Sequence, residues 1–154
     1  MWFVAAFFAL VGPIVAEDGF TVDVRADLDE KAYPIWVAKG DTIRFAVSGT
    51  WSMWSKWSAV DYRGHRDFQK INANGYLGAL VGRVEGEKDF LVVDGGSYTS
   101  PVAGRLVLFP NRGNYRNLGA SGVLTVRVEG GSFSDDALSE ARAGWDIAAL
   151  DTAK

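Results

Sequence analysis

The sequence predicts an all-β protein, an antiparallel jelly-roll β-sandwich of about eight strands followed by a short C-terminal helix. Short segments with strand-like patterns recur at roughly 8–15-residue intervals, as in sandwiches and jelly rolls. The turns between them are rich in glycine, with 18 Gly in 154 residues. No segment between these strands before residue 130 places apolar residues at helical spacing. The length allows one domain.

Each expected strand carries its own pattern. Residues 20–26 alternate apolar and polar side chains, which is typical of a half-buried strand. Residues 42–48 place Ile43, Phe45 and Val47 on one face, and residues 77–84 form a nearly unbroken apolar run, typical of a strand covered on both sides. The expected strands span residues 20–26, 33–37, 42–48, 77–84, 90–93, 105–109 and 122–128.

The tail, residues 131–154, has a different pattern. Leu138, Ala141, Trp145 and Ala148 follow one another at steps of three and four residues, and Ser134 or Asp135 can cap the first turn. Gly144 weakens this helix by about 1 kcal/mol relative to alanine. We expect a short helix over residues 134–150 that lies on the sandwich.

The N-terminal segment, residues 1–16, is apolar and uncharged. It is shorter than the about 20 residues that span a bilayer, and small or aliphatic residues precede Glu17. We expect a signal peptide cleaved after Ala16, although the segment lacks basic residues; a buried N-terminal strand or helix is the alternative. The expected location is secreted or periplasmic, with residues 17–130 as the folded domain and no transmembrane segment.

Composition excludes several classes of function. The absence of cysteine excludes disulfide frameworks and Cys-ligated metals, and a single histidine excludes His-pair metal motifs. The chain has a net charge of −3, and its acidic and basic residues are interspersed along the sequence, so the sequence gives no sign of the basic patch expected of a nucleic-acid-binding protein. No G-x-S-x-G motif marks a serine nucleophile. We therefore expect a binding protein, not an enzyme.

The longest connection, residues 49–76, concentrates aromatic side chains. Long loops in compact domains are usually functional or flexible. The rings either form a satellite cluster that pins the loop to the sheet or provide an apolar platform for a ligand. Three exposed indoles would favour aggregation, so at least one tryptophan is expected to be buried. The loop's rings are those of Trp51, Trp54, Trp57, Tyr62, His65, Phe68 and Tyr76.

Three segments, in the same order, resemble the bacterial galactophilic lectins of the LecA (PA-IL-like) family. They are VAKGDTIRFAVSGTW at residues 37–51, LGALVGRV at 77–84, and GRLVLFPN at 104–111 followed by SGVLTV at 121–126. The resemblance covers about residues 20–129. It implies a calcium-dependent, galactose-binding jelly-roll sandwich.

The resemblance also implies where a sugar binds. His65 lies thirteen residues before Gly78, which is the position of the family's sugar-binding histidine. The family's neighbouring glutamine falls on Phe68, with Gln69 one residue further on. The remaining ligand-binding candidates are Trp54, Asn111, Arg112, Asn114 and Asn117.

In the family, calcium is held by a carbonyl equivalent to that of Trp54 and by the loop before the last strand. Here that loop contains no Asp or Glu, although calcium usually takes at least one carboxylate. Asn117 matches one family ligand and Asn114 offers a carbonyl, whereas Arg112 and Arg116 bring positive charge. We expect no cofactor or at most weakly bound calcium; a guanidinium in the place of calcium is a further possibility.

The sequence thus predicts a lectin-like protein that binds a carbohydrate or glycoconjugate without turning it over, with a homo-oligomer possible. The alternative is a structural or protein-interaction sandwich of the cell envelope that has lost calcium and sugar binding. His65 is the polar residue on which binding is expected to depend most. A structural role, with a hydrogen bond to Asp61 or Asp67, is the competing interpretation.

Overall fold

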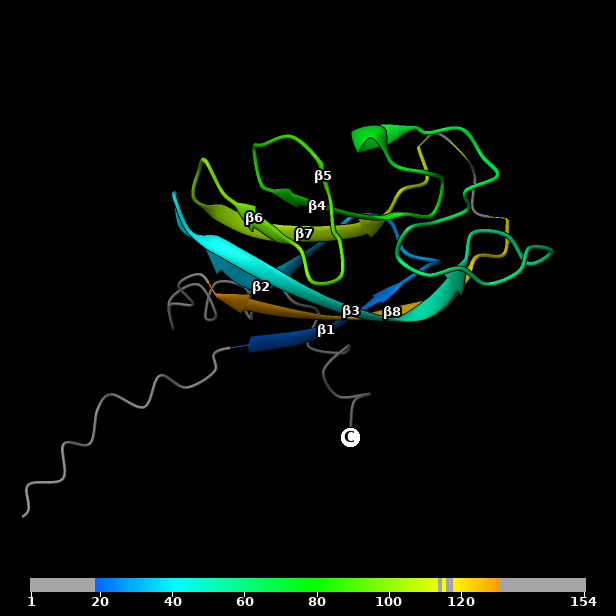
Figure 1. Cartoon of the computed structure of the whole chain (residues 1–154), viewed down its shortest axis with the longest axis horizontal. Helices are drawn as coiled ribbons and strands as arrows, with labels where there is room; N and C mark the ends of the chain where they lie inside the picture. The colour runs from blue at the N-terminus through cyan, green and yellow to red at the C-terminus, as the bar shows by residue number, and fades with distance from the viewer. Residues whose placement is uncertain (1–18, 114, 116–117, 131–154) are drawn as a thin grey trace, which may run out of the picture.

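The computed structural model describes residues 19–113, 115 and 118–130 (Figure 1). The predicted signal peptide, the predicted C-terminal helix and the side chains of Asn114, Arg116 and Asn117 lie outside the described residues.

The described chain forms two four-stranded antiparallel sheets, one on the other (Figure 1). The first has the strand order β1-β8-β3-β6 and the second β2-β7-β4-β5. The expectation of an all-β fold with antiparallel sheets is confirmed, and a sandwich fits it. The elements are β1 (Gly19–Arg25), β2 (Lys31–Val37), β3 (Thr42–Ser52), the 3₁₀ turn η1 (Asn72–Asn74), β4 (Leu80–Val84), β5 (Phe90–Leu91), β6 (Ser97–Thr99), β7 (Gly104–Pro110) and β8 (Ser121–Gly130).

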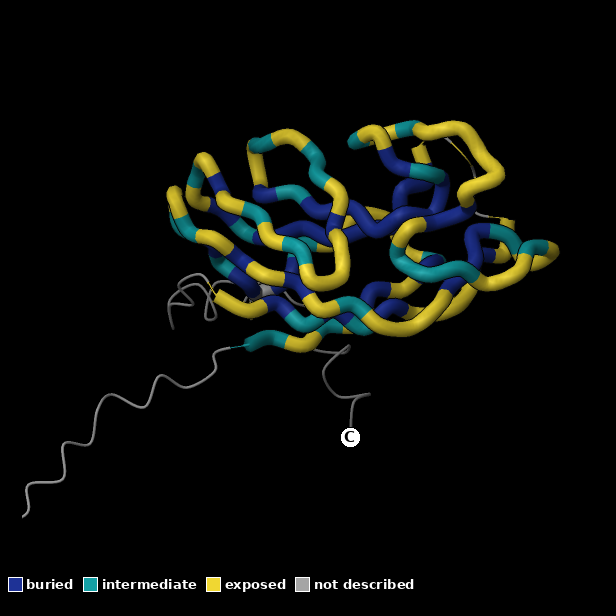
Figure 2. The backbone as a smooth tube through the Cα atoms, in the orientation of Figure 1, coloured by how far each residue is buried: buried dark blue, intermediate teal, exposed yellow. Residues whose placement is uncertain are grey.

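The core lies between the two sheets, as the buried stretches in Figure 2 show. Alternation along β1, β3 and β8 sends every second side chain inward, which is why the period-2 pattern identified these strands. The fully buried aliphatic residues come from both sheets: Val24, Ile35, Val37, Ile43, Leu80, Val84, Leu106, Leu108, Leu124, Val126 and Val128. In β4, Val81 is also buried, in a second cluster with Val107 and Phe109. Both faces of this strand are therefore covered, as its unbroken apolar pattern predicted.

Several strand boundaries differ from the expectation. β3 continues to Ser52 because its pairing with β8 extends from Ile43–Gly130 to Ser52–Ser121. β4 begins at Leu80, not residue 77, because Gly78 has a left-handed φ of +79° that interrupts an extended strand. β6 was not expected; its three residues pair with the start of β3. None of the helices in the described part of the chain is long and apolar enough to span a bilayer.

Candidate functional site

The long loop between β3 and β4, residues 53–79, is tied to the sandwich by backbone hydrogen bonds. Trp51 and Val60 exchange N–H···O bonds of 2.9 and 2.7 Å. The N–H of Leu80 donates to the carbonyl of Tyr62 at 2.8 Å, and the N–H of His65 donates to that of Leu77 at 2.8 Å. Because these bonds fix the loop at several points, it presents its side chains in a defined arrangement.

Four rings of the long loop, those of Trp54, Trp57, His65 and Phe68, form one cluster beside the main core. The ring of Trp57 lies 5.2 Å from Trp54, 4.9 Å from His65 and 4.4 Å from Phe68, between centroids. Trp51 belongs to the main core instead, with 1% of its surface exposed and its indole N–H donating to the carbonyl of Gly78 at 2.7 Å. The expectation that at least one of the three loop tryptophans is buried is therefore confirmed.

His65 is the buried member of this cluster, with 7% of its surface exposed. Its Nε2 accepts a hydrogen bond from the backbone N–H of Met53 at 3.3 Å, whereas Asp61 pairs with Arg63 at 2.6 Å. Burial lowers the pKa of His65, and the nearby charge of Asp67 opposes part of that effect. The ring thus holds two parts of the loop together as a neutral acceptor.

We expect His65 to make stability depend on pH. Because its pKa is lower in the folded chain, the unfolded chain binds a proton first as pH falls below about 6.5. The free energy of unfolding should therefore fall with pH below that value and be unaffected by His65 above it. Urea unfolding between pH 7.5 and 5 should show this slope, and His65→Asn should flatten it. Equal slopes in the two proteins would contradict the prediction.

The structure brings together the two loops that the lectin resemblance pairs. Trp54 forms a parallel bridge with Leu118, and the N–H of Ser55 donates to the carbonyl of Leu118 at 3.3 Å. Phe68 and Gln69 are exposed, and Phe68 lies against Trp57 in the aromatic cluster. Asn114 and Asn117, the remaining candidates of this region, lie outside the described residues.

Asn111 and Arg112 are buried and turned to backbone carbonyls. The amide nitrogen of Asn111 donates to the carbonyls of Asn72, Gly75 and Tyr76 at 3.0–3.2 Å, so this side chain fixes the turn around η1. The guanidinium of Arg112 donates to the carbonyls of Ala26 and Leu28, between β1 and β2.

These described residues do not fit a calcium ion. The carbonyl of Trp54 already accepts bonds from the hydroxyl of Ser52 at 2.8 Å and the N–H of Trp57 at 3.0 Å. The amide nitrogen of Asn111 and the guanidinium of Arg112 donate to the carbonyls around them. The Oδ1 of Asn111 is buried without a hydrogen-bond partner, but it is a single oxygen where calcium takes six to eight. Within the described ranges, no group of three or more His, Cys, Asp or Glu residues is placed to hold a metal.

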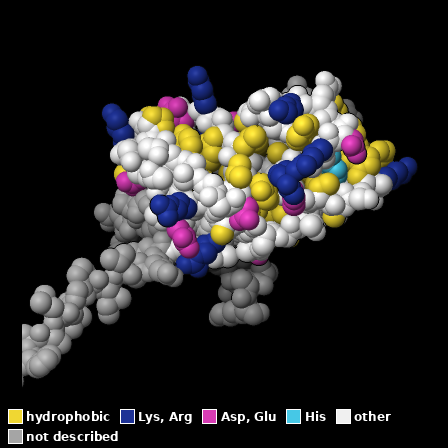
Figure 3. All heavy atoms as spheres, in the orientation of Figure 1, with side chains coloured by type: hydrophobic (Ala, Val, Ile, Leu, Met, Phe, Trp, Pro, Cys, Tyr) yellow, Lys and Arg dark blue, Asp and Glu magenta, His cyan; other side chains and the backbone are white. Residues whose placement is uncertain are grey.

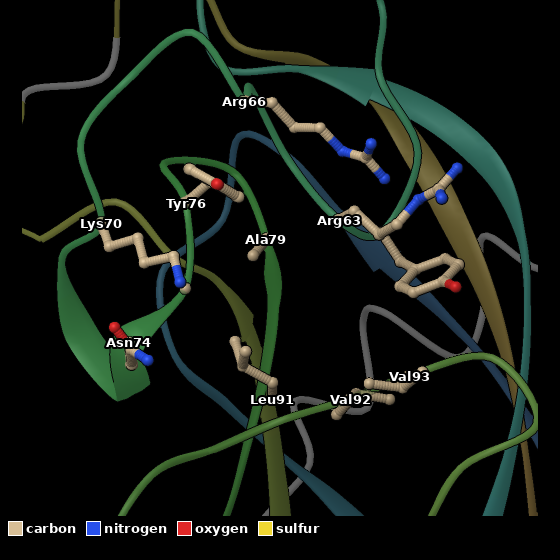
Figure 4. A pocket seen from close by; sticks show the side chains of 11 residues that line it. Arg63, Arg66, Lys70, Asn74, Tyr76, Ala79, Leu91, Val92 and Val93 are labelled. Atoms are coloured by element: carbon tan, nitrogen blue, oxygen red, sulfur yellow. The ribbon is translucent and has the colours of Figure 1, made fainter.

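A pocket, here called the loop pocket, opens between the long loop and the end of β5. Its cavity volume is about 280 Å³. Figure 4 shows Arg63 and Arg66 on one side and Lys70, Asn74 and Tyr76 on the other. In Figure 3, basic and hydrophobic side chains adjoin one another on this face of the molecule. The lining residues are Tyr62, Arg63, Arg66, Lys70, Asn74, Gly75, Tyr76, Ala79, Leu91, Val92 and Val93.

The far wall of the loop pocket is a tightly constrained turn. Ala73 and Asn74 have left-handed φ angles of 51° and 57°, a conformation that costs free energy for a residue with a Cβ. The turn is held by the amide of Asn111 and by the bond from the N–H of Ile71 to the carbonyl of Gly75 at 2.8 Å. Asn111 thus has a positioning role: it holds the segment that carries Asn74 and Tyr76.

Two tyrosine rings of the loop pocket each make a cation–π contact with a basic side chain. The Nζ of Lys70 lies 5.6 Å from the ring centre of Tyr76, and the guanidinium of Arg63 lies 5.7 Å from that of Tyr62. Sequence reasoning identified both tyrosines as loop aromatics but missed Arg63, Arg66, Lys70 and Asn74. The sequence feature that could have identified them is the recurrence of basic residues at positions 63, 66 and 70 within the aromatic loop.

The fold is similar to that of a known lectin domain. A solved structure described as "EclA N-terminal domain; PllA-like lectin" matches with a TM-score of 0.60 and 19% sequence identity, over 75% of this chain and 99% of that chain. No family model and no curated protein matches the sequence. At this identity the likeness shows a shared lectin-like β fold and does not single out the LecA family.

Proposed function

We propose that this protein is a non-catalytic carbohydrate-binding protein that holds a galactoside-type glycan in the loop pocket. The observation that carries the proposal is the combination of tyrosine rings and polar donors around one cavity. Tyr62 and Tyr76 provide aromatic surface, and Asn74 with the basic side chains provides hydrogen-bond donors. Ligand pockets combine apolar walls with a few fixed polar groups in this way.

The lectin-like fold and the resemblance of residues 37–51, 77–84 and 104–126 to galactophilic lectins support this proposal. A non-catalytic role is supported by the pocket's chemistry. Glycoside hydrolysis usually employs a pair of carboxyl groups, and none of the described lining residues is Asp or Glu. A secreted or periplasmic location is part of the proposal and is supported by the apolar segment 1–16.

A glycan array tests the proposal directly. We expect the purified protein to retain galactose-containing glycans, and Tyr76→Ala to weaken this binding by about tenfold, the loss of one aromatic contact. Tyr115→Ala is the matched control, because Tyr115 is 50% exposed on the loop that the lectin resemblance favours. If Tyr115→Ala weakened binding and Tyr76→Ala did not, the glycan would bind at the loop of Tyr115 and not in the loop pocket. Absence of all glycan binding would leave the structural or protein-interaction alternative.

We propose that binding does not require calcium. Titration calorimetry with calcium chloride should show no micromolar site, and the array pattern should be the same with and without EDTA. The physical reason is that the loop before β8, residues 111–120, contains no Asp or Glu and carries the positive charges of Arg112 and Arg116. A micromolar calcium site, or loss of glycan binding in EDTA, would restore the family mechanism.

A further inference from the structure

The loop pocket is positively charged although the whole chain is negative. Three cations, Arg63, Arg66 and Lys70, are among the described lining residues, and no carboxylate is. The chain as a whole carries a net charge of −3. The pocket therefore has a charge that sets it apart from the rest of the molecule.

Carboxylates also lie near the pocket, although none of them is among its described lining residues: Asp61 and Asp67 belong to the same loop as the cations, and Asp94 follows Val93. Asp61 pairs with Arg63 at 2.6 Å, and both Arg63 and Arg66 lower the pKa of Asp61. Asp94, which follows Val93, accepts a hydrogen bond from the backbone N–H of Val47 at 2.9 Å. Among the described residues, neither Arg66 nor Lys70 forms an ion pair, and Lys70 lies against the ring of Tyr76, so an anionic ligand would meet both cations without displacing a carboxylate.

The shape of the cavity limits the ligand to a small one. Its volume of about 280 Å³ is just below the roughly 300–1,000 Å³ of typical ligand pockets, which suits about one or two sugar rings. Leu91, Val92 and Val93 form an apolar base, and the basic side chains stand on two opposite sides (Figure 4). A sugar ring on this base would place its exocyclic groups near cations on either side.

We propose that the loop pocket selects a sugar that carries a carboxylate, such as a hexuronate unit of a glycan. This inference rests on the carbohydrate-binding function proposed above and adds the ligand's chemical class. A guanidinium offers two parallel N–H donors that match the two oxygens of a carboxylate. Arg66 is the primary partner of the carboxylate, and Lys70 contributes a second charge from the opposite wall.

The test compares two trisaccharides with the same sugar backbone, trigalacturonate and its methyl ester, in which each carboxylate is replaced by an uncharged ester group. By titration calorimetry in 50 mM NaCl, we expect the free acid to bind at least about tenfold more tightly than the ester, since both partners of the ion pair are then present. Arg66→Gln and Lys70→Gln should each weaken binding of the acid by about threefold, and the double variant by about tenfold. Lys39→Gln, an exposed charge removal on the turn between β2 and β3, is the control and should change nothing.

The outcomes separate this inference from the proposed function. Equal binding of acid and ester, unchanged by Arg66→Gln, overturns carboxylate selection but leaves carbohydrate binding in place. Tighter binding of a sulfated galactotriose than of trigalacturonate also overturns it. Failure of both trisaccharides and of every glycan on the array overturns the proposed function itself. A preference for the acid that falls in 500 mM NaCl and in the double variant supports the inference.

Discussion

Replacing Trp51 with alanine should lower the free energy of unfolding by about 3–5 kcal/mol, a large share of the stability of a domain of this size. Trp51 is fully buried in the main core, and its indole N–H donates to the carbonyl of Gly78 at 2.7 Å. The variant loses the buried ring, leaves a cavity and leaves that carbonyl without its donor. Urea unfolding followed by circular dichroism measures the loss.

Trp51→Phe distinguishes the contribution of the buried aromatic ring from that of the indole hydrogen bond. It keeps most of the apolar volume but leaves the buried carbonyl of Gly78 unpaired, which costs about 1–3 kcal/mol. We therefore expect the phenylalanine variant to be less destabilised than the alanine variant. If Trp51→Ala lost less than about 1 kcal/mol, the indole would not be part of the core as described.

Replacing Gly64 with alanine should destabilise the protein by about 3 kcal/mol and disturb the loop pocket. Gly64 has a φ of +80°, and a Cβ there would lie 2.5 Å from the nitrogen of Ala79 and 2.6 Å from the carbonyl oxygen of Leu77. Backbone atoms cannot yield as a flexible side chain can. The loop would have to shift between Arg63 and Arg66, so glycan binding should weaken together with stability. Urea unfolding and calorimetry of the same variant measure both effects.

Gly86→Ala is the matched control for this prediction. Gly86 has a similar φ of +85°, but nothing lies within 4 Å of the position that its Cβ would take. The control should therefore show only the cost of the left-handed conformation, about 1–2 kcal/mol, with unchanged binding. Equal destabilisation of the two variants would show that close packing at Gly64 contributes nothing.

The sequence by itself determined the features that depend on local pattern. Alternation along residues 20–26 and 122–128 predicted the ends of β1 and β8 to within about two residues, because a period of two must send every second side chain into a core. The burial of a loop tryptophan followed from the cost of exposing three indoles.

Only the tertiary structure decided which side chains line the loop pocket and which are buried. Asn111 and Arg112 carry groups that suit a binding site, but both are buried and bonded to carbonyls far away in the sequence. The loop pocket joins residues 62–79 to residues 91–93 across the β4–β5 pair, and β6 exists through its pairing with β3. Such contacts link segments that are distant along the chain. A local pattern encodes whether a residue is buried on its own strand, whereas the partner that it meets is determined by how the two sheets and their loops pack together.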